Sequence, residues 1–211
     1  ALNANRAYFQ SLITTTETKA IQSVAFATLL TADQSDKLAR TLIKGNVENL
    51  TNYLNGIALL TDQPLQKSLY GYVKEQTLEQ TAEKFNPIQN QLRRSTAYRV
   101  LTQIGGNEPE KVKIISQLIV PNGKFVNDAV AIINSIQTNE LKQNYASETV
   151  KQILNYVSLD NSTQDDSFDA VVNLGQKMAT LLPNEESKKA LVVLQAAGTL
   201  EVLLKAKKKK M

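Results

Sequence analysis

The 211-residue sequence contains no cysteine, no histidine and no tryptophan. Without cysteine the chain cannot form a disulfide framework, and without cysteine or histidine it cannot build a zinc site from those ligands. The serine–histidine and cysteine–histidine pairs that activate a catalytic nucleophile are excluded for the same reason. Because the two commonest catalytic side chains are absent, the composition favours a protein that is not an enzyme.

Membrane-spanning helices are also not expected, because no apolar run approaches the roughly 18 residues that a span needs. Hydrophobic residues make up 42% of the chain and charged residues 21%, as in an ordinary globular protein. This composition excludes wholesale disorder, which requires few hydrophobic residues and a high net charge. The length is enough for one large domain or two small ones.

The formal charge of +4 comes from the last residues of the chain. Five of the 24 basic residues are Lys205, Lys207, Lys208, Lys209 and Lys210. The remaining 19 basic and 20 acidic residues give the body a charge of −1, with +3 on residues 1–105 and −4 on residues 106–204. The chain is a weak dipole with a basic tail, so attraction to a polyanion would come from the tail and from residues 93–99.

Capping residues and prolines divide the chain at intervals of about one helix. Asp62–Pro64, Asn86–Pro87 and Asn107–Pro109 each combine an N-cap side chain with a proline suited to the first helical turn. Asp33 is expected to cap a helix that ends before Gly45, a residue that tolerates positive φ. Helix starts are therefore the clearest local signal in the sequence.

Between these signals the apolar residues recur with the period of a helix. The sequence predicts an all-α fold, a multi-helix bundle of about ten helices, over residues 3–13, 17–30, 33–44, 47–60, 64–84, 87–104, 109–119, 124–137, 140–158, 167–182 and 185–206. Residues 112–133 are rich in β-branched side chains and offer a hairpin as the alternative, but the helix start at residues 108–110 favours helices. We expect one domain over residues 1–204, with a boundary near 105–107 if it has two lobes, and a basic tail over 205–211.

The last predicted helix has the broadest apolar surface. Its stripe consists of residues three and four apart, namely Ala190, Val193, Ala197, Leu200 and Leu204. Three further leucines widen this stripe (Leu191, Leu194 and Leu203). An apolar face of that width has to be covered by another element.

Four glycines fall inside predicted helices, where each costs about 1 kcal/mol relative to alanine. They are Gly56, Gly71, Gly175 and Gly198. We expect them at places where a neighbouring helix approaches closely or, at Gly71, where the helix bends.

The candidate ligand contacts are basic. On the predicted helix 87–104, Arg94 and Tyr98 are four residues apart and share a face, with Arg93 and Arg99 beside them. This group suits a phosphate or a nucleobase, whereas the structural alternative is pairing with acids of a neighbouring helix. The tail lysines offer the same choice between stabilising a helix C-terminus and contacting nucleic acid or anionic lipid.

No metal and no cofactor is predicted. Residues 160–169 are rich in oxygen ligands, but this segment lacks the glycine at position six and the glutamate at position twelve of a calcium loop. The acids of this segment are interpreted instead as a cap for the helix that follows.

The first functional hypothesis is a non-enzymatic helical subunit that works through its surfaces, by binding a protein partner or by self-association. The alternative is a nucleic-acid-associated subunit that uses residues 93–99 and the lysine tail, similar in size and class to the small helical subunits of CRISPR surveillance complexes but sharing no motif with them. A third hypothesis is a carrier of an apolar ligand or pigment between helices. The sequence leaves the cellular compartment open.

Overall fold

The computed structural model describes residues 5–79, 85–136, 139–158 and 166–208, and within these ranges the chain forms helices and turns without any strand. The predicted all-α fold is therefore confirmed. The chain divides into two compact units, residues 1–106 and 107–211. The sequence analysis expected one domain, with a boundary near residues 105–107 if it had two lobes, and this expectation stays a prediction.

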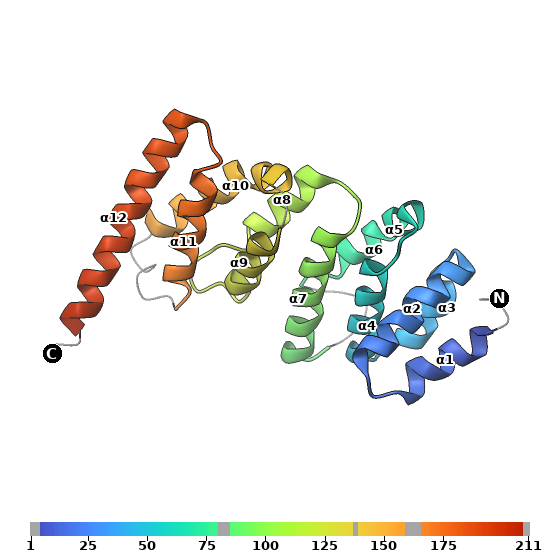
Figure 1. The fold of residues 1–211 in the computed structure, drawn as a ribbon. Coiled ribbons are helices and arrows are strands. Elements are labelled where there is room, and N and C mark those ends of the chain that lie inside the picture. Colours follow the sequence, from blue (N-terminus) through green and yellow to red (C-terminus); the bar gives the residue numbers. More distant parts are fainter. Residues whose placement is uncertain (1–4, 80–84, 137–138, 159–165, 209–211) are drawn as a thin grey trace. The chain divides into compact units, whose positions relative to one another are not determined.

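Unit 1 contains the helices α1 to α7 (Figure 1), namely α1 (Arg6–Thr15), α2 (Lys19–Asp33), α3 (Lys37–Ile43), α4 (Val47–Ala58), α5 (Gln63–Ser68), α6 (Tyr70–Glu75) and α7 (Pro87–Gln103). Helix α2 packs against α1, α3 and α4, and α4 packs in turn against α7, which also contacts α6. Phe26, Tyr53 and Tyr72 link α2, α4 and α6 through two edge-to-face ring contacts, each with centroids 5.6 Å apart. These rings lie in a core to which most helices of the unit contribute.

Two of the three caps predicted in unit 1, Asp62 and Asn86, form as expected. The Asp62 carboxylate accepts a hydrogen bond from the backbone N–H of Leu65 at 3.0 Å, at the start of α5. Asn86 and Gln89 form a reciprocal capping box at the start of α7, with bonds of 2.9 and 3.0 Å. Local chemistry thus fixes where these two helices begin.

The expected cap at Asp33 is wrong. Gln34 adopts a left-handed conformation with φ of 48°, which ends α2 at Asp33, so Asp33 belongs to the preceding helix. The N-cap residue of α3 is Asp36, whose carboxylate accepts a hydrogen bond from Arg40 at 2.5 Å. The two acids are only three positions apart in the chain, which makes them hard to distinguish as caps from sequence.

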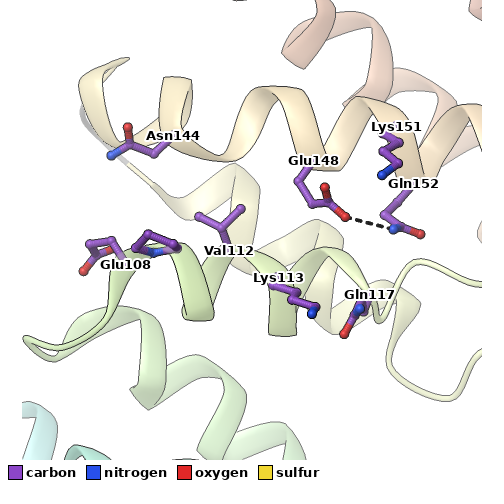
Figure 2. A pocket seen from close by; sticks show the side chains of 9 residues that line it. Glu108, Val112, Lys113, Gln117, Asn144, Glu148, Lys151 and Gln152 are labelled. Carbon is purple, nitrogen blue, oxygen red and sulfur yellow. Dashed lines mark hydrogen bonds between the residues drawn. The ribbon is translucent and has the colours of Figure 1, made fainter.

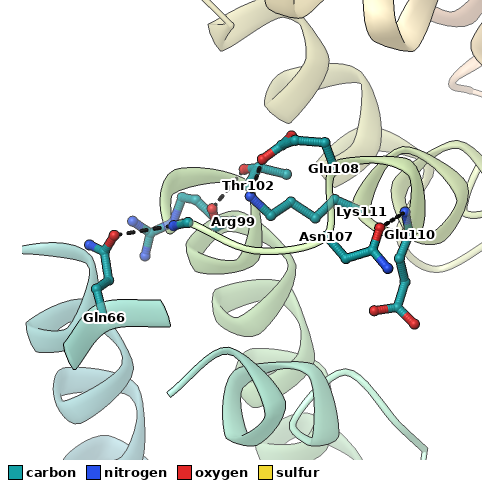
Figure 3. A network of polar contacts seen from close by, with 8 residues as sticks. Gln66, Arg99, Thr102, Asn107, Glu108, Glu110 and Lys111 are labelled. Atoms are coloured by element: carbon teal, nitrogen blue, oxygen red, sulfur yellow. Dashed lines mark hydrogen bonds and ion pairs between the residues drawn. The ribbon is translucent and has the colours of Figure 1, made fainter. Parts of the chain in front are cut away.

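The predicted helix over residues 64–84 is also wrong in extent. It is broken at Leu69 into α5 and α6 and ends at Glu75, and residues 80–84 lie outside the described residues. The buried side chain of Gln66 helps to hold this arrangement, since its amide donates to the carbonyls of Ile57 and Leu60 at 3.2 Å each. Its oxygen accepts from the N–H of Gly105 at 3.2 Å, which ties α5 to the end of α7 (Figure 3).

Unit 2 contains the helices α8 to α12, namely α8 (Glu108–Ser116), α9 (Val126–Ser135), α10 (Asn139–Ser158), α11 (Phe168–Ala179) and α12 (Asn184–Lys208). Helix α10 contacts α8, α11 and α12, and α11 also packs against α9 and α12. Asn107 caps α8 by accepting from the N–H of Glu110 at 3.3 Å (Figure 3). Ser116 and Thr149 are fully buried and hydrogen-bond to each other at 3.1 Å, which joins α8 to α10 inside the core.

Residues 112–133 belong to two helices, α8 and α9, and to the turn between them. Asn122 takes a positive φ of 56° in that turn. The helical interpretation of this segment is confirmed, and the hairpin alternative is not found in it. Asn107 caps α8 at its start, and this local signal for a helix outweighs the β-branched composition, which favours strands.

Close approach between helices occurs at two of the four predicted glycines. A Cβ at Gly56 would lie 2.8 Å from the carbonyl oxygen of Ser23, and one at Gly175 would lie 2.8 Å from Ile153. Gly198 has only an ordinary contact with Val172, and Gly71 has open space around it. The glycines of α4 and α11 therefore allow close packing of these helices, whereas that of α6 does not.

Candidate functional site

Arg93 was the first residue of the predicted ligand-binding group, and the structure places it inside unit 1. Its guanidinium is fully buried and donates to the carbonyl oxygens of Gln76 and Leu78 at 2.6 and 2.8 Å, and to the side chain of Asn90 at 3.1 Å. Burial, and secondarily the charge of Arg94, lower the pKa of Arg93, but an arginine keeps its proton at neutral pH. A polyanion in solution has no access to this group.

Arg94 and Tyr98 share a face, as the sequence predicted, but that face contacts the backbone after α6. Arg94 donates to the carbonyl of Thr77 at 3.0 Å and to the hydroxyl of Tyr98 at 3.0 Å. Tyr98 is buried and donates to the same carbonyl of Thr77 at 3.2 Å. These side chains therefore satisfy carbonyl groups that follow the end of α6, where helical N–H partners are absent.

Arg99 lies apart from this cluster. It is exposed and donates to the side chain of Asn55 on α4 at 2.8 Å. The contacts of Arg93, Arg94 and Tyr98 account for these residues without any ligand. Arg93, Arg94 and Tyr98 therefore have a structural role, as the alternative to a binding face predicted. Their partners are backbone carbonyls, however, and not the acidic side chains that were expected.

The lysine tail begins within a helix. The backbone of α12 continues to Lys208, so positions 205, 207 and 208 belong to its last turns. Lys209 and Lys210 lie outside the described residues. Positive charge at a helix C-terminus is favourable because it faces the negative end of the helix dipole.

One hollow in the described part of the chain lies in unit 2, between α8 and α10. It is an open groove of about 730 Å³, within the range of ligand sites in proteins. Figure 2 shows Val112 projecting between the two helices and polar side chains along both rims. The lining residues are Glu108, Pro109, Val112, Lys113 and Gln117 from α8, and Asn144, Glu148, Lys151 and Gln152 from α10.

The acids and the lysines of this groove differ in their contacts. Glu108 forms an ion pair with the buried Lys111 at 2.5 Å, and Glu148 accepts from the amide of Gln152 at 3.0 Å. Lys113 and Lys151 make no ion pair with any residue that the structure describes. The groove therefore has two cations available to a ligand at the end where Gln117 and Gln152 lie (Figure 2).

Glu108 also affects the titration of a buried side chain outside the groove, that of Tyr145. Burial, and then the negative charge of Glu108, raise the pKa of Tyr145 above its usual value. Tyr145 is therefore a neutral group at physiological pH, and its ring is buried with the core of unit 2.

The outward side of α12 carries a second candidate surface. Ala190 and Leu194 are buried, whereas Val192, Val193 and Leu200 are 67%, 47% and 52% exposed. The stripe predicted from sequence is thus divided, because Val193 and Leu200 lie on the side that faces away from the core. We call the exposed residues Val192, Val193, Ala196 and Leu200 the α12 stripe.

A second hollow lies in unit 1 between α1 and α2. It measures about 240 Å³ and is lined by the apolar side chains of Phe9, Leu12, Ala20, Ile21, Val24 and Ala25. This volume is below the roughly 300 Å³ at which ligand sites begin. The hollow gives little support to the hypothesis of a pigment or apolar-ligand carrier.

In the described ranges, no helix combines the length and the hydropathy needed to cross a bilayer. Among the same residues, no three carboxylates lie close enough together to hold a metal ion.

Sequence reasoning missed the groove, and it expected the apolar face of α12 to be covered by another element of the chain. The groove depends on the pairing of α8 with α10, whose lining residues are more than a helix apart in the chain and have no local signature. The stripe had a local signal, since the apolar residues of α12 are not confined to one side of the helix, and a neighbour that packs on one side leaves the others exposed.

No protein-family model, curated protein or solved structure matches this chain.

Proposed function

We propose that this protein is a non-catalytic assembly subunit that self-associates through the α12 stripe. The observation that supports the proposal is the exposure of Val192, Val193 and Leu200 on one side of a helix whose other side packs on α11. Exposed apolar side chains that follow one another along a helix mark interaction surfaces, whereas scattered ones need no explanation. Burying them against a partner gains about 25 cal/mol per Å² of apolar surface.

The partner that fits this stripe is α12 of a second copy, in antiparallel orientation. A two-fold axis near Ala196 and Ala197 would place Val193 of each copy against Leu200 of the other. The same patch then serves on both copies, which is the geometry of the commonest homodimers. Two such helices would pack by fitting the side-chain ridges of one into the grooves of the other, as helix pairs commonly do.

Charges at the two ends of α12 support the antiparallel orientation. The first turn contains Glu185 and Glu186, and the last turns contain lysines at positions 205, 207 and 208. Antiparallel pairing brings acids beside lysines, whereas parallel pairing would bring lysines beside lysines. Glu185 has an exposed ion pair with Lys188 at 3.2 Å, which contributes little and is easily exchanged.

The nucleic-acid alternative has less support. Arg93, Arg94 and Tyr98 are bound to the backbone of unit 1, so the group that was to contact phosphates is already engaged. The tail lysines remain compatible with a polyanion, but a basic tail by itself supplies only salt-dependent, non-specific binding.

The proposal is tested by light scattering on the full chain over a range of concentrations. We expect a mass twice the 23.3 kDa of the chain, and a return to the monomer for the double variant Val193→Glu, Leu200→Glu. Ile88→Glu is the matched control, because Ile88 is 80% exposed in unit 1 and lies outside the stripe.

Circular dichroism shows whether each variant keeps its helices, so loss of the dimer is not confused with unfolding. A wild-type chain that stays monomeric at high concentration contradicts the proposal. A dimer that withstands the double variant, or one that Ile88→Glu disrupts equally, contradicts it as well.

A further inference from the structure

We propose that the groove between α8 and α10 binds an extended, acidic peptide segment of a partner protein. The inference goes beyond self-association, and the groove shares no residue with the α12 stripe. It rests on three observations: the free amides along the rims, the two lysines without ion pairs, and the apolar floor.

Side-chain amides line both rims of the groove. Gln117 of α8 and Asn144 of α10 make no side-chain hydrogen bond with any described residue. The oxygen of Gln152 also remains available, because its contact with Glu148 uses the nitrogen. An amide group offers both a donor and an acceptor, which is what the N–H and C=O groups of an extended backbone require.

Two lysines of the groove favour a peptide that carries an acidic side chain. Lys113 and Lys151 come from opposite rims and lie at the same end of the groove (Figure 2). A carboxylate between them would accept charge-assisted hydrogen bonds from both ammonium groups, and such bonds are stronger than neutral ones. Glu148 lies at the same end and weakens the positive field, which favours one carboxylate over a highly charged polyanion.

The floor of the groove is apolar and held in place from below. Val112 and Pro109 offer an apolar surface beside the polar rims. Ser116 and Thr149 join the two helices beneath it, and the ion pair of Lys111 with Glu108 fixes the first turns of α8. The hydrogen bond between Ser116 and Thr149 joins the two walls of the groove, so the groove itself needs little ordering when a segment binds.

The test is a selection of short random peptides displayed on phage against the full chain. We expect the enriched peptides to contain aspartate or glutamate, and a fluorescein-labelled peptide from this set to bind in fluorescence anisotropy. The double variant Lys113→Glu, Lys151→Glu is expected to weaken its affinity about tenfold or more.

The matched control is Lys124→Glu, Lys177→Glu, which changes the net charge equally at two exposed lysines of unit 2 outside the groove. Its affinity should stay within about twofold of the wild type, since distant charges are screened by salt. The variant Val193→Glu, Leu200→Glu should bind the peptide like the wild type, which separates failure of this site from failure of self-association.

The inference is overturned if no peptide is enriched or if the enriched peptides lack acidic residues. Equal weakening by both lysine pairs would assign the binding to non-specific charge. Retention of single-stranded RNA by the full chain, lost in Lys113→Glu, Lys151→Glu and accompanied by no peptide binding, would assign the groove to a polyanion instead.

Discussion

At the scale of single residues, Arg93 shows how one side chain can support a segment that has no regular structure. Its guanidinium reaches back from α7 to the carbonyls of Gln76 and Leu78, which follow the last turn of α6. Arginine suits this role because its donors are arranged in a rigid plane and its charge persists when buried. The residue that looked most like a phosphate ligand is therefore a structural connection between α7 and the turn after α6.

Replacing Arg93 by methionine should destabilise unit 1 by about 3 kcal/mol, because buried carbonyls lose hydrogen bonds from a charged donor. Arg99→Met is the matched control, since Arg99 is exposed on the same helix and makes one contact with Asn55. We expect the control to change stability by less than about 0.5 kcal/mol. Urea unfolding followed by far-ultraviolet circular dichroism measures both, and equal effects would contradict the structural role of Arg93.

At the scale of helices, the contact of α2 with α4 depends on the absence of a side chain at Gly56. A Cβ there would lie 2.8 Å from the carbonyl oxygen of Ser23 and 3.0 Å from the Cβ of Phe26. Moving the backbone of α2 away from α4 would cost free energy, because the buried ring of Phe26 in α2 packs against the ring of Tyr53 in α4. Gly71 lies in α6 with nothing within 4 Å of its hypothetical Cβ.

These two glycines should respond to alanine with opposite signs. Gly56→Ala is expected to cost about 1–3 kcal/mol, because overpacking outweighs the gain in helix propensity. Gly71→Ala should stabilise the chain by about 0.5–1 kcal/mol, since only the propensity changes. Thermal unfolding of both variants tests this, and a Gly56→Ala protein as stable as Gly71→Ala would contradict the close contact.

At the scale of the whole molecule, the chain divides into two units, each with its own set of contacting helices. Unit 1 buries Phe26, Tyr53 and Leu101, and unit 2 buries Ile153, Phe168 and Leu194 among others. Chains of about a hundred residues bury enough apolar surface to fold alone. Independent folding is the expectation for both.

Expression of residues 1–106 and 107–211 as separate chains tests this expectation. Each fragment should give a helical spectrum and a cooperative thermal transition. Because α12 belongs to the second fragment, that fragment should also self-associate, whereas residues 1–106 should stay monomeric. A fragment that melts without cooperativity would contradict independent folding.

The sequence by itself determined the helical class and several helix starts. Asp62, Asn86 and Asn107 cap the helices predicted after them, because a cap is an interaction between residues two or three positions apart. Signals of this kind depend on neighbours in the chain and need no knowledge of the fold.

Only the tertiary structure decided which faces are covered and which side chains remain available. Arg93 is buried because the segment of residues 76–79 packs against it, whereas Arg99 has no such neighbour and stays exposed. The side of α12 that became the exposed stripe depended on how α11 packs against it. The groove arose because α8 and α10 are joined through Ser116 and Thr149, 33 positions apart in the chain, and contacts over that distance depend on the packing of the whole unit, which no local pattern encodes.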